Sequence, residues 1–124
     1  MGTRSTTKIY EDGKLLLALY KQYDGYPTGW GKELKNFIKS GKFVNGIPMG
    51  VEGRMFNGMG DFALQLVVQF KEGSGGLYAT TEDDSQEFNY KIEYKNGKEG
   101  DEIVISCEES KKFGKVIKLP SRFP

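Results

Sequence analysis

The stretch richest in groups able to bind a ligand runs from Tyr20 to Gly31 and reads Tyr-Lys-Gln-Tyr-Asp-Gly-Tyr-Pro-Thr-Gly-Trp-Gly. The rings of Tyr26 and Trp30 could stack on a flat ligand, and their hydroxyl and indole N–H groups seek hydrogen-bond partners. Pro27 disfavours a helical conformation for Tyr26, so the chain bends here. Two interpretations are open. The stretch is either a ligand-contacting loop, in which Asp24 accepts from ribose hydroxyls, or an aromatic turn over the core, in which Asp24 caps its own turn.

A second stretch, Arg54 to Asp61, places a guanidinium, an aromatic ring, an amide and glycines just before an apolar segment. Backbone N–H groups at a helix start attract anions, and Gly58 would let a phosphate approach the backbone closely. The spacing lacks the Gly-Lys-Ser/Thr that marks a phosphate-binding P-loop. In the alternative interpretation, Asn57 or Asp61 simply caps the following helix.

Other candidate residues carry weaker signals. Arginine suits forked contacts with phosphate, and Arg122, one of three arginines, could hold a phosphate or lie free near the end of the chain. Asp83-Asp84 could hold a divalent cation, but two acids at a loop tip are more typical of solvated surface. Cys107 is typical of a small core residue.

Composition excludes several catalytic classes. The chain has no His and one Cys, which removes Ser-His-Asp and Cys-His catalysis and zinc sites of His and Cys, so no metal and no cofactor is predicted. The 18 basic and 17 acidic residues nearly balance, which argues against binding to a nucleic acid polymer. The start of the chain has no signal-peptide core, and no apolar run reaches the length of a membrane span. We therefore expect an intracellular protein with no membrane partner.

Two helices are expected to position these residues. Apolar residues recur at helical spacing from Trp30 to Ile38, which predicts a first helix with Thr28 as its N-cap and Gly41 as its stop. A second helix is predicted from Met59 to Phe70, and its apolar residues on nearly all sides predict deep burial. The glycine-rich segment from Phe43 to Gly60 predicts an irregular connection.

The rest of the chain has the alternation and composition of β-strands. Strands are predicted at Thr6 to Tyr10, Lys14 to Tyr20, Gly76 to Thr80, Glu87 to Tyr94, Glu102 to Cys107 and Lys112 to Leu119. Asp12-Gly13 predicts a hairpin between the first two, and Asn96-Gly97 predicts the start of a later turn. The expected fold class is α+β, a single domain (1–124) with an antiparallel sheet of about five or six strands and two helices packed on it.

Several blocks of the chain, in this order, resemble one family of small phage and prophage proteins. The blocks are Met-Gly-Thr-Arg-Ser-Thr-Thr, Tyr-Lys-Gln-Tyr-Asp-Gly-Tyr-Pro-Thr-Gly-Trp-Gly, Phe-Asn-Gly-Met-Gly-Asp-Phe-Ala-Leu-Gln-Leu-Val and Gly-Gly-Leu-Tyr. They look like the first-described Thoeris anti-defence family, whose members act as sponges. The resemblance covers residues 1 to about 95, and Tyr-Asp-Gly-Tyr-Pro is its most specific part.

The resemblance implies a protein that is not an enzyme. Members of the family bind the cyclic ADP-ribose isomers made by bacterial TIR-domain proteins and hold them intact, so that the defence effector is not triggered. They are α+β proteins that form homo-oligomers, either dimers or hexamers, and some hexameric members also take up cyclic di- or trinucleotides at separate sites. By this resemblance the chain would work in the cytoplasm of the host bacterium.

Residue chemistry within the shared blocks gives a predicted ligand-binding set. Tyr26 and Trp30, with Phe56 or Phe88, would sandwich the base. Arg54 and Arg122 would hold the phosphates. Asn57, Gly58 and Asn89 would make polar contacts, and Asp24 would take a ribose hydroxyl. The set contains no catalytic residue and no metal ligand.

Two other functions compete with the sponge. The Tyr-rich loop could anchor a protein–protein inhibitor of a host factor, because exposed Tyr and Trp are favoured interface residues. A cyclic nucleotide-degrading enzyme is the other rival, and its chemistry would rest on carboxylates, Lys and Tyr. Recovery of an intact or an altered ligand separates the sponge from the enzyme.

Overall fold

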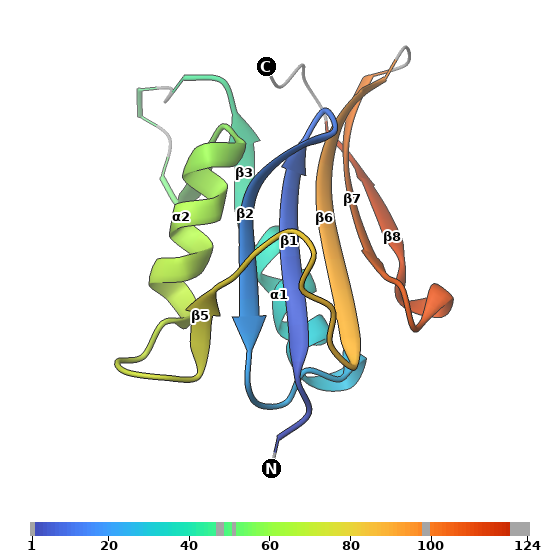
Figure 1. The fold of residues 1–124 in the computed structure, drawn as a ribbon. Helices are drawn as coiled ribbons and strands as arrows, with labels where there is room; N and C mark the ends of the chain where they lie inside the picture. Colours follow the sequence, from blue (N-terminus) through green and yellow to red (C-terminus); the bar gives the residue numbers. More distant parts are fainter. Residues whose placement is uncertain (1, 47–48, 51, 98–99, 120–124) are drawn as a thin grey trace.

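The computed structural model describes residues 2–46, 49–50, 52–97 and 100–119 (Figure 1). Two helices lie within these residues, α1 (Lys32–Lys39) and α2 (Met59–Phe70). The strands are β1 (Ser5–Glu11), β2 (Lys14–Lys21), β3 (Gly41–Val44), β4 (Arg54–Asn57), β5 (Leu77–Ala79), β6 (Phe88–Gly97), β7 (Gly100–Cys107) and β8 (Lys115–Lys118). A π-helical turn, Pro27–Gly31, precedes α1, and a 3₁₀ turn, Lys111–Phe113, precedes β8.

Six strands form the main sheet in the order β5-β2-β1-β6-β7-β8. The predicted α+β class, with a sheet of five or six strands and two helices, is confirmed. One feature differs from the prediction, because β1 and β6 at the centre of the sheet run parallel, with Thr6 opposite Asn89 and Lys8 opposite Lys91. The other neighbouring pairs are antiparallel, and Asp12-Gly13 joins β1 to β2 as predicted.

A second, two-stranded sheet lies inside the segment that the sequence predicted to be irregular. Strands β3 and β4 pair in parallel, with Phe43 opposite Phe56, and both rings are buried. The prediction of an irregular connection from Phe43 to Gly60 is therefore wrong at its two ends. Four-residue strands flanked by glycines carry too little alternation to be recognised, and the buried rings hold them in place.

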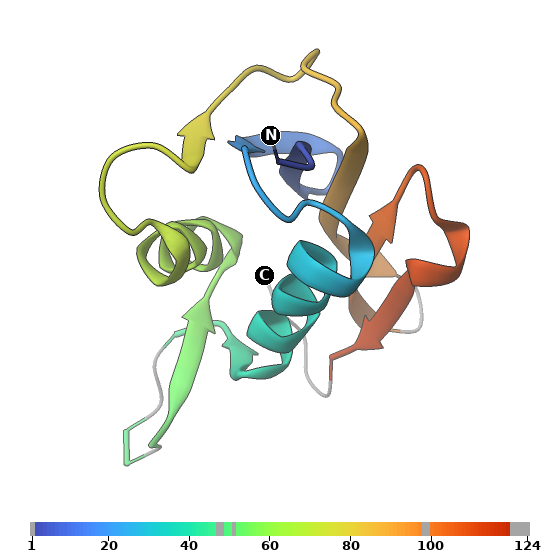
Figure 2. The same cartoon turned by 90° about the horizontal axis from the view of Figure 1, so that it is seen from below.

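The helices cover one face of the main sheet, and residues 80–87 cross the other face (Figure 2). The core between helices and sheet is strongly aromatic, with the rings of Phe37, Phe56 and Phe62 about 5 Å apart. Its largest fully buried side chains are Trp30, Tyr90, Tyr94, Phe56, Phe62, Ile9, Leu34, Ile38, Met59, Leu66 and Ile92. We name residues 80–87 the crossing segment.

Three local predictions about helix and strand ends need correction. The helical path begins at Pro27 rather than at a Thr28 cap, because proline is pre-organised for the first helical position and Tyr26 before it is extended. The bounds of α2 agree with the prediction, but its deep burial is wrong, since Leu64 is 66% and Val68 80% exposed. β6 continues through Gly97, so the turn predicted from Asn96-Gly97 falls on residues outside the described ones.

Candidate functional site

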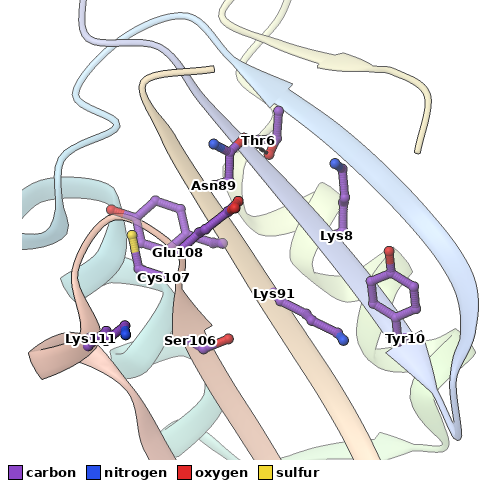
Figure 3. Close-up of a pocket in the computed structure, with 10 residues that line it drawn as sticks. Thr6, Lys8, Tyr10, Asn89, Lys91, Ser106, Cys107, Glu108 and Lys111 are labelled. Carbon is purple, nitrogen blue, oxygen red and sulfur yellow. Dashed lines mark hydrogen bonds between the residues drawn. The ribbon is translucent and has the colours of Figure 1, made fainter. Parts of the chain in front are cut away.

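The outer face of the main sheet, away from the helices, carries a hollow of about 430 Å³ (Figure 3). It lies over β1, β6 and β7, and Glu108 and Lys111 lie beyond the end of β7. We name it the outer trough. Its lining residues are Thr6, Lys8, Tyr10, Asn89, Tyr90, Lys91, Ser106, Cys107, Glu108 and Lys111.

Strand alternation places most of these side chains on the outer face, whereas Tyr90 and Cys107 are buried in the core. Along β1, Thr7 and Ile9 point into the core, so Lys8 and Tyr10 point outward. The parallel register then sets Lys8 beside Lys91 of β6, and the antiparallel register sets Ser106 of β7 beside Lys91 on its other side. The trough is thus a product of strand pairing between segments far apart in the sequence.

The lining of the trough contains several lysine side chains and the phenol ring of Tyr10. Lys8, Lys91 and Lys111 supply three ammonium groups, whereas Glu108 is the acid in the lining. The Lys91 ammonium lies 4.8 Å from the centroid of the Tyr10 ring and 3.3 Å from a carboxylate oxygen of Glu93. Burial, followed by a hydrogen bond to Glu82, raises the pKa of the Tyr10 hydroxyl, which therefore stays a neutral donor at physiological pH.

The crossing segment forms one wall of the trough. The Lys8 ammonium donates to the Asp84 carbonyl oxygen at 2.7 Å, and the Tyr10 hydroxyl donates to Glu82 at 3.1 Å. The Asp84 carboxylate accepts from Thr80 and Gln86 within the same segment. These contacts give Asp84 a structural role, and in the described part of the chain no three His, Cys, Asp or Glu side chains converge as metal ligands.

Asn89, one of the predicted polar contacts, lies in the trough with its amide fully bonded. Its Oδ1 accepts from the Thr6 hydroxyl at 2.7 Å and from the Gln86 N–H at 2.9 Å. Its Nδ2 donates to the Gln86 carbonyl oxygen and to a carboxylate oxygen of Glu109, at 2.8 and 2.7 Å. Asn89 therefore ties the crossing segment, through Gln86, and the residues after β7, through Glu109, to the sheet.

The predicted aromatic loop divides into an exposed tip and a buried base. Trp30 is fully buried, its indole N–H donates to the Thr7 hydroxyl at 2.7 Å, and Phe70 packs edge-on against its ring. Asp24 and Tyr26 are exposed at the tip, where Asp24 has a positive φ of 58° and its carbonyl accepts from the Trp30 N–H. Trp30 thus closes over the core, as the second interpretation predicted, and its predicted role in stacking on a base finds no support in the fold.

The predicted residues of the second stretch lie around β4, on the helix side of the sheet. Phe56 is fully buried among other Phe rings, so a stacking role for it also finds no support. Arg54 is exposed, donates to the Gln69 amide oxygen at 3.1 Å and lies over the Phe37 ring. The Asp61 carboxylate accepts from the Asn57 N–H at 2.8 Å, but the N-cap of α2 is Gly58 and receives no side-chain cap hydrogen bond, so the predicted capping by Asn57 or Asp61 is wrong.

Three predicted residues remain, Gly58, Phe88 and Arg122. Gly58 has φ 91° immediately before α2, a conformation that glycine adopts without strain. Phe88 is partly buried and packs against the core. Arg122 lies outside the described residues. The structure therefore does not gather the predicted set into one site, and of its members only Asn89 lines the outer trough.

The sequence prediction missed the trough lysines. Lys8 and Lys91 occupy polar positions of alternating strands, where a solvated lysine is the ordinary interpretation. Their one distinguishing property is that they face each other across the β1–β6 pair. That pairing is parallel, and the predicted sheet was antiparallel, so the sequence offered no signal that joins them.

Comparisons with known proteins identify no relative. The chain matches no protein-family model, no curated protein and no solved structure. Across the described residues, no helix is long and apolar enough to cross a membrane.

Proposed function

We propose that the protein is a phage-encoded sponge, which binds a cyclic ADP-ribose-type immune signal in the cytoplasm of the host bacterium and holds it without cleaving it. The resemblance of the blocks between residues 1 and about 95 supports the class of function. The outer trough supports the place of binding. The observation that carries the proposal is the presence of three lysines, Lys8, Lys91 and Lys111, in the lining of one hollow of nucleotide size.

The trough chemistry suits the pyrophosphate and ribose groups of a cyclic ADP-ribose isomer. A pyrophosphate carries two negative charges, and Lys8, Lys91 and Lys111 would neutralise them by charge-assisted hydrogen bonds. Ser106 and the Tyr10 hydroxyl would bond ribose hydroxyls from the sheet surface. The two hollows next to Arg54 are poorer matches, because among their described lining residues each sets the single cation Arg54 against one acid, Glu33 in one hollow and Asp61 in the other.

The decisive experiment recovers the ligand after binding. Purified protein is incubated with cyclic ADP-ribose isomers, separated from free ligand and heat-denatured, and the released material is analysed by mass spectrometry. We expect the released ligand to have an unchanged mass. An altered mass would show an enzyme, and no retained ligand would overturn the proposal.

Variants then locate the site. Lys91→Gln and Lys8→Gln should each weaken binding about tenfold, the loss expected for one charge-assisted hydrogen bond, as measured by calorimetry. Lys14→Gln is the matched control, because Lys14 is an exposed lysine at the opposite end of the β1–β2 hairpin from Thr6. A tenfold loss from Arg54→Ala with no loss from the trough variants would move the site to β4.

A homo-oligomer is part of the proposal. Leu64 and Val68 are one helical turn apart on α2 and leave an apolar strip exposed on the helix side of the molecule. A second copy packing on this strip would leave the outer trough accessible, because the trough lies on the opposite face of the sheet.

The exposed loop tip favours one second function. Tyr23 and Tyr26 are 55% and 40% exposed, and amphipathic rings of this kind anchor protein interfaces. A protein–protein inhibitor of a host factor would lose its partner on Tyr23→Ala and Tyr26→Ala, and those variants would leave retention of a cyclic nucleotide unchanged.

A further inference from the structure

A second hollow, of about 510 Å³, lies between β3 and β8 at the edge of the main sheet. We name it the edge groove. Its floor is apolar and its rim is cationic, and the residues concerned are Ile38, Phe43, Ile117 and Leu119 below, with Lys39, Lys42 and Lys118 above. Among the residues that the structure describes, no acidic side chain lines the groove. The groove is separate from the outer trough, with which it shares no residue.

Lysines are crowded beside this groove. Lys115 of β8 lies close to α1, where the neighbouring ammonium of Lys39, followed by burial and by the charge of Lys35, lowers the pKa of the Lys115 ammonium. The Lys35 ammonium lies 3.8 Å from the centroid of the Phe113 ring. In the described part of the chain none of these lysines has a carboxylate partner. Like charges held together destabilise one another, and an acidic occupant would relieve them.

The backbone around the groove is also open. β8 is the edge strand of the main sheet and, within the described residues, pairs with β7 alone. An edge strand presents every second N–H and C=O away from its neighbour, which is the arrangement that accepts an added strand. Both β3 and β8 are four residues long, which matches an added segment of about four residues, or ~13 Å.

We propose that the edge groove binds an extended acidic segment of a partner protein, with apolar side chains alternating with carboxylates. The segment would pair with the free edge of β8, place its apolar side chains on the groove floor and direct its carboxylates to Lys39, Lys42 and Lys118. A free phosphate would use the rim and leave the apolar floor uncovered, whereas a basic segment would be repelled. A peptide with alternating apolar and acidic residues is the occupant that contacts the apolar floor, the lysine rim and the free edge of β8 at the same time.

The test uses a defined peptide, acetyl-Glu-Val-Glu-Val-Glu-Val-amide, with acetyl-Lys-Val-Lys-Val-Lys-Val-amide as its charge-reversed partner. Binding to the full chain is followed by fluorescence anisotropy of labelled peptides and by amide shifts in ¹⁵N-correlated NMR spectra. The acidic peptide should bind at least tenfold more tightly than the basic one, and the largest shifts should fall on residues 41–44 and 115–119. Equal affinity for both peptides, or shifts centred elsewhere, would overturn the proposal.

Charge-reversal variants distinguish binding in the edge groove from non-specific electrostatic attraction to the protein surface. Lys42→Glu and Lys118→Glu should each weaken the acidic peptide about tenfold, whereas Lys14→Glu, an exposed lysine outside the groove, should change its affinity less than twofold. Displacement of the peptide by equimolar tripolyphosphate would show that the groove binds phosphate and would refute the proposal of an acidic peptide. None of these variants touches the outer trough, so the result is independent of the sponge.

Discussion

At the scale of single residues, Trp30 ties the aromatic loop to the sheet. Its indole N–H donates to the Thr7 hydroxyl at 2.7 Å in a fully buried position. Phe70 of α2 packs against the same ring with centroids 4.8 Å apart, so Trp30 joins loop, sheet and helix. A residue with these three contacts contributes mainly to the stability of the fold.

Trp30→Phe should lower the free energy of unfolding by about 2–4 kcal/mol, because it leaves the Thr7 hydroxyl without its buried donor and removes part of a packed ring. Urea unfolding followed by circular dichroism measures this loss. Retention of the cyclic nucleotide by the folded variant should be unchanged. A variant of full stability that no longer retains ligand would contradict the core role of Trp30.

The sequence could not decide where Trp30 points. An aromatic residue in a glycine-rich loop faces either solvent or core, and the choice depends on a partner such as Thr7, 23 residues away. Cys107, by contrast, was predicted as a core residue and is buried, because strand alternation fixes its face. Residue roles could be predicted where one element determines them, and could not where two distant elements meet.

At the scale of elements, two glycines show opposite surroundings. A Cβ on Gly25 would lie 2.7 Å from Ser5 Cβ and 2.9 Å from the Thr3 carbonyl oxygen, so the loop and the N-terminal segment could not both keep their places. A Cβ on Gly60, in the first turn of α2, would meet no atom within 4 Å.

Gly25→Ala should therefore destabilise the protein by about 1–3 kcal/mol through overpacking. Gly60→Ala should stabilise it by about 0.5–1 kcal/mol, because alanine favours the helix and restricts the unfolded chain. Thermal unfolding of the two variants beside the parent chain measures both effects. Equal shifts in the same direction would contradict the packing described around Gly25.

Helix α2 presents an apolar strip that a second copy can cover. Val68→Lys should weaken self-association at least tenfold, measured by sedimentation at several concentrations, while a lysine near a helix C-terminus leaves the folded chain stable. Leu16→Lys is the matched control, an exposed apolar residue on β2. An unchanged assembly with Val68→Lys would place the contact between copies elsewhere.

Some elements could be predicted from sequence and others could not. The β1–β2 hairpin and the bounds of α2 follow from local signals, a turn dipeptide and a helical period that ends before glycine. Strands β3 and β4 escaped prediction because each is four residues long and their pairing is non-local. The outer trough escaped for the same reason, since it depends on the β1–β6 register.

At the scale of the whole molecule, two buried tyrosines set the alkaline limit of stability. The Tyr90 hydroxyl donates to the Gly25 carbonyl oxygen and the Tyr94 hydroxyl to an Asp101 carboxylate oxygen, at 2.7 and 2.9 Å. Burial raises the pKa of both phenols well above 10, and for Tyr94 the hydrogen bond to Asp101 raises it further. In the unfolded chain both ionise near pH 10.

The stabilising effect of these phenols is complete below pH 10 and is lost as the pH rises toward their folded-state pKa values, because only the unfolded chain releases the protons. The free energy of unfolding should fall by about 1.4 kcal/mol per pH unit for each tyrosine above pH 10. Urea unfolding between pH 8 and 11.5 measures the slope. Tyr90→Phe should make the slope shallower, because it removes one of the two buried phenols, and an unchanged slope would contradict this assignment.

The parallel pairing of β1 with β6 also governs how the chain is made. Thr6 and Asn89 are 83 residues apart, so β1 lacks one of its two neighbours until β6 has been synthesised. Closing so long a loop carries an entropic cost that local hairpins avoid, and it slows folding. The β1–β2 hairpin can form early, but its inner edge stays open during translation. The centre of the sheet is thus completed only after β6 has emerged, and slower synthesis at low temperature should raise the yield of folded protein.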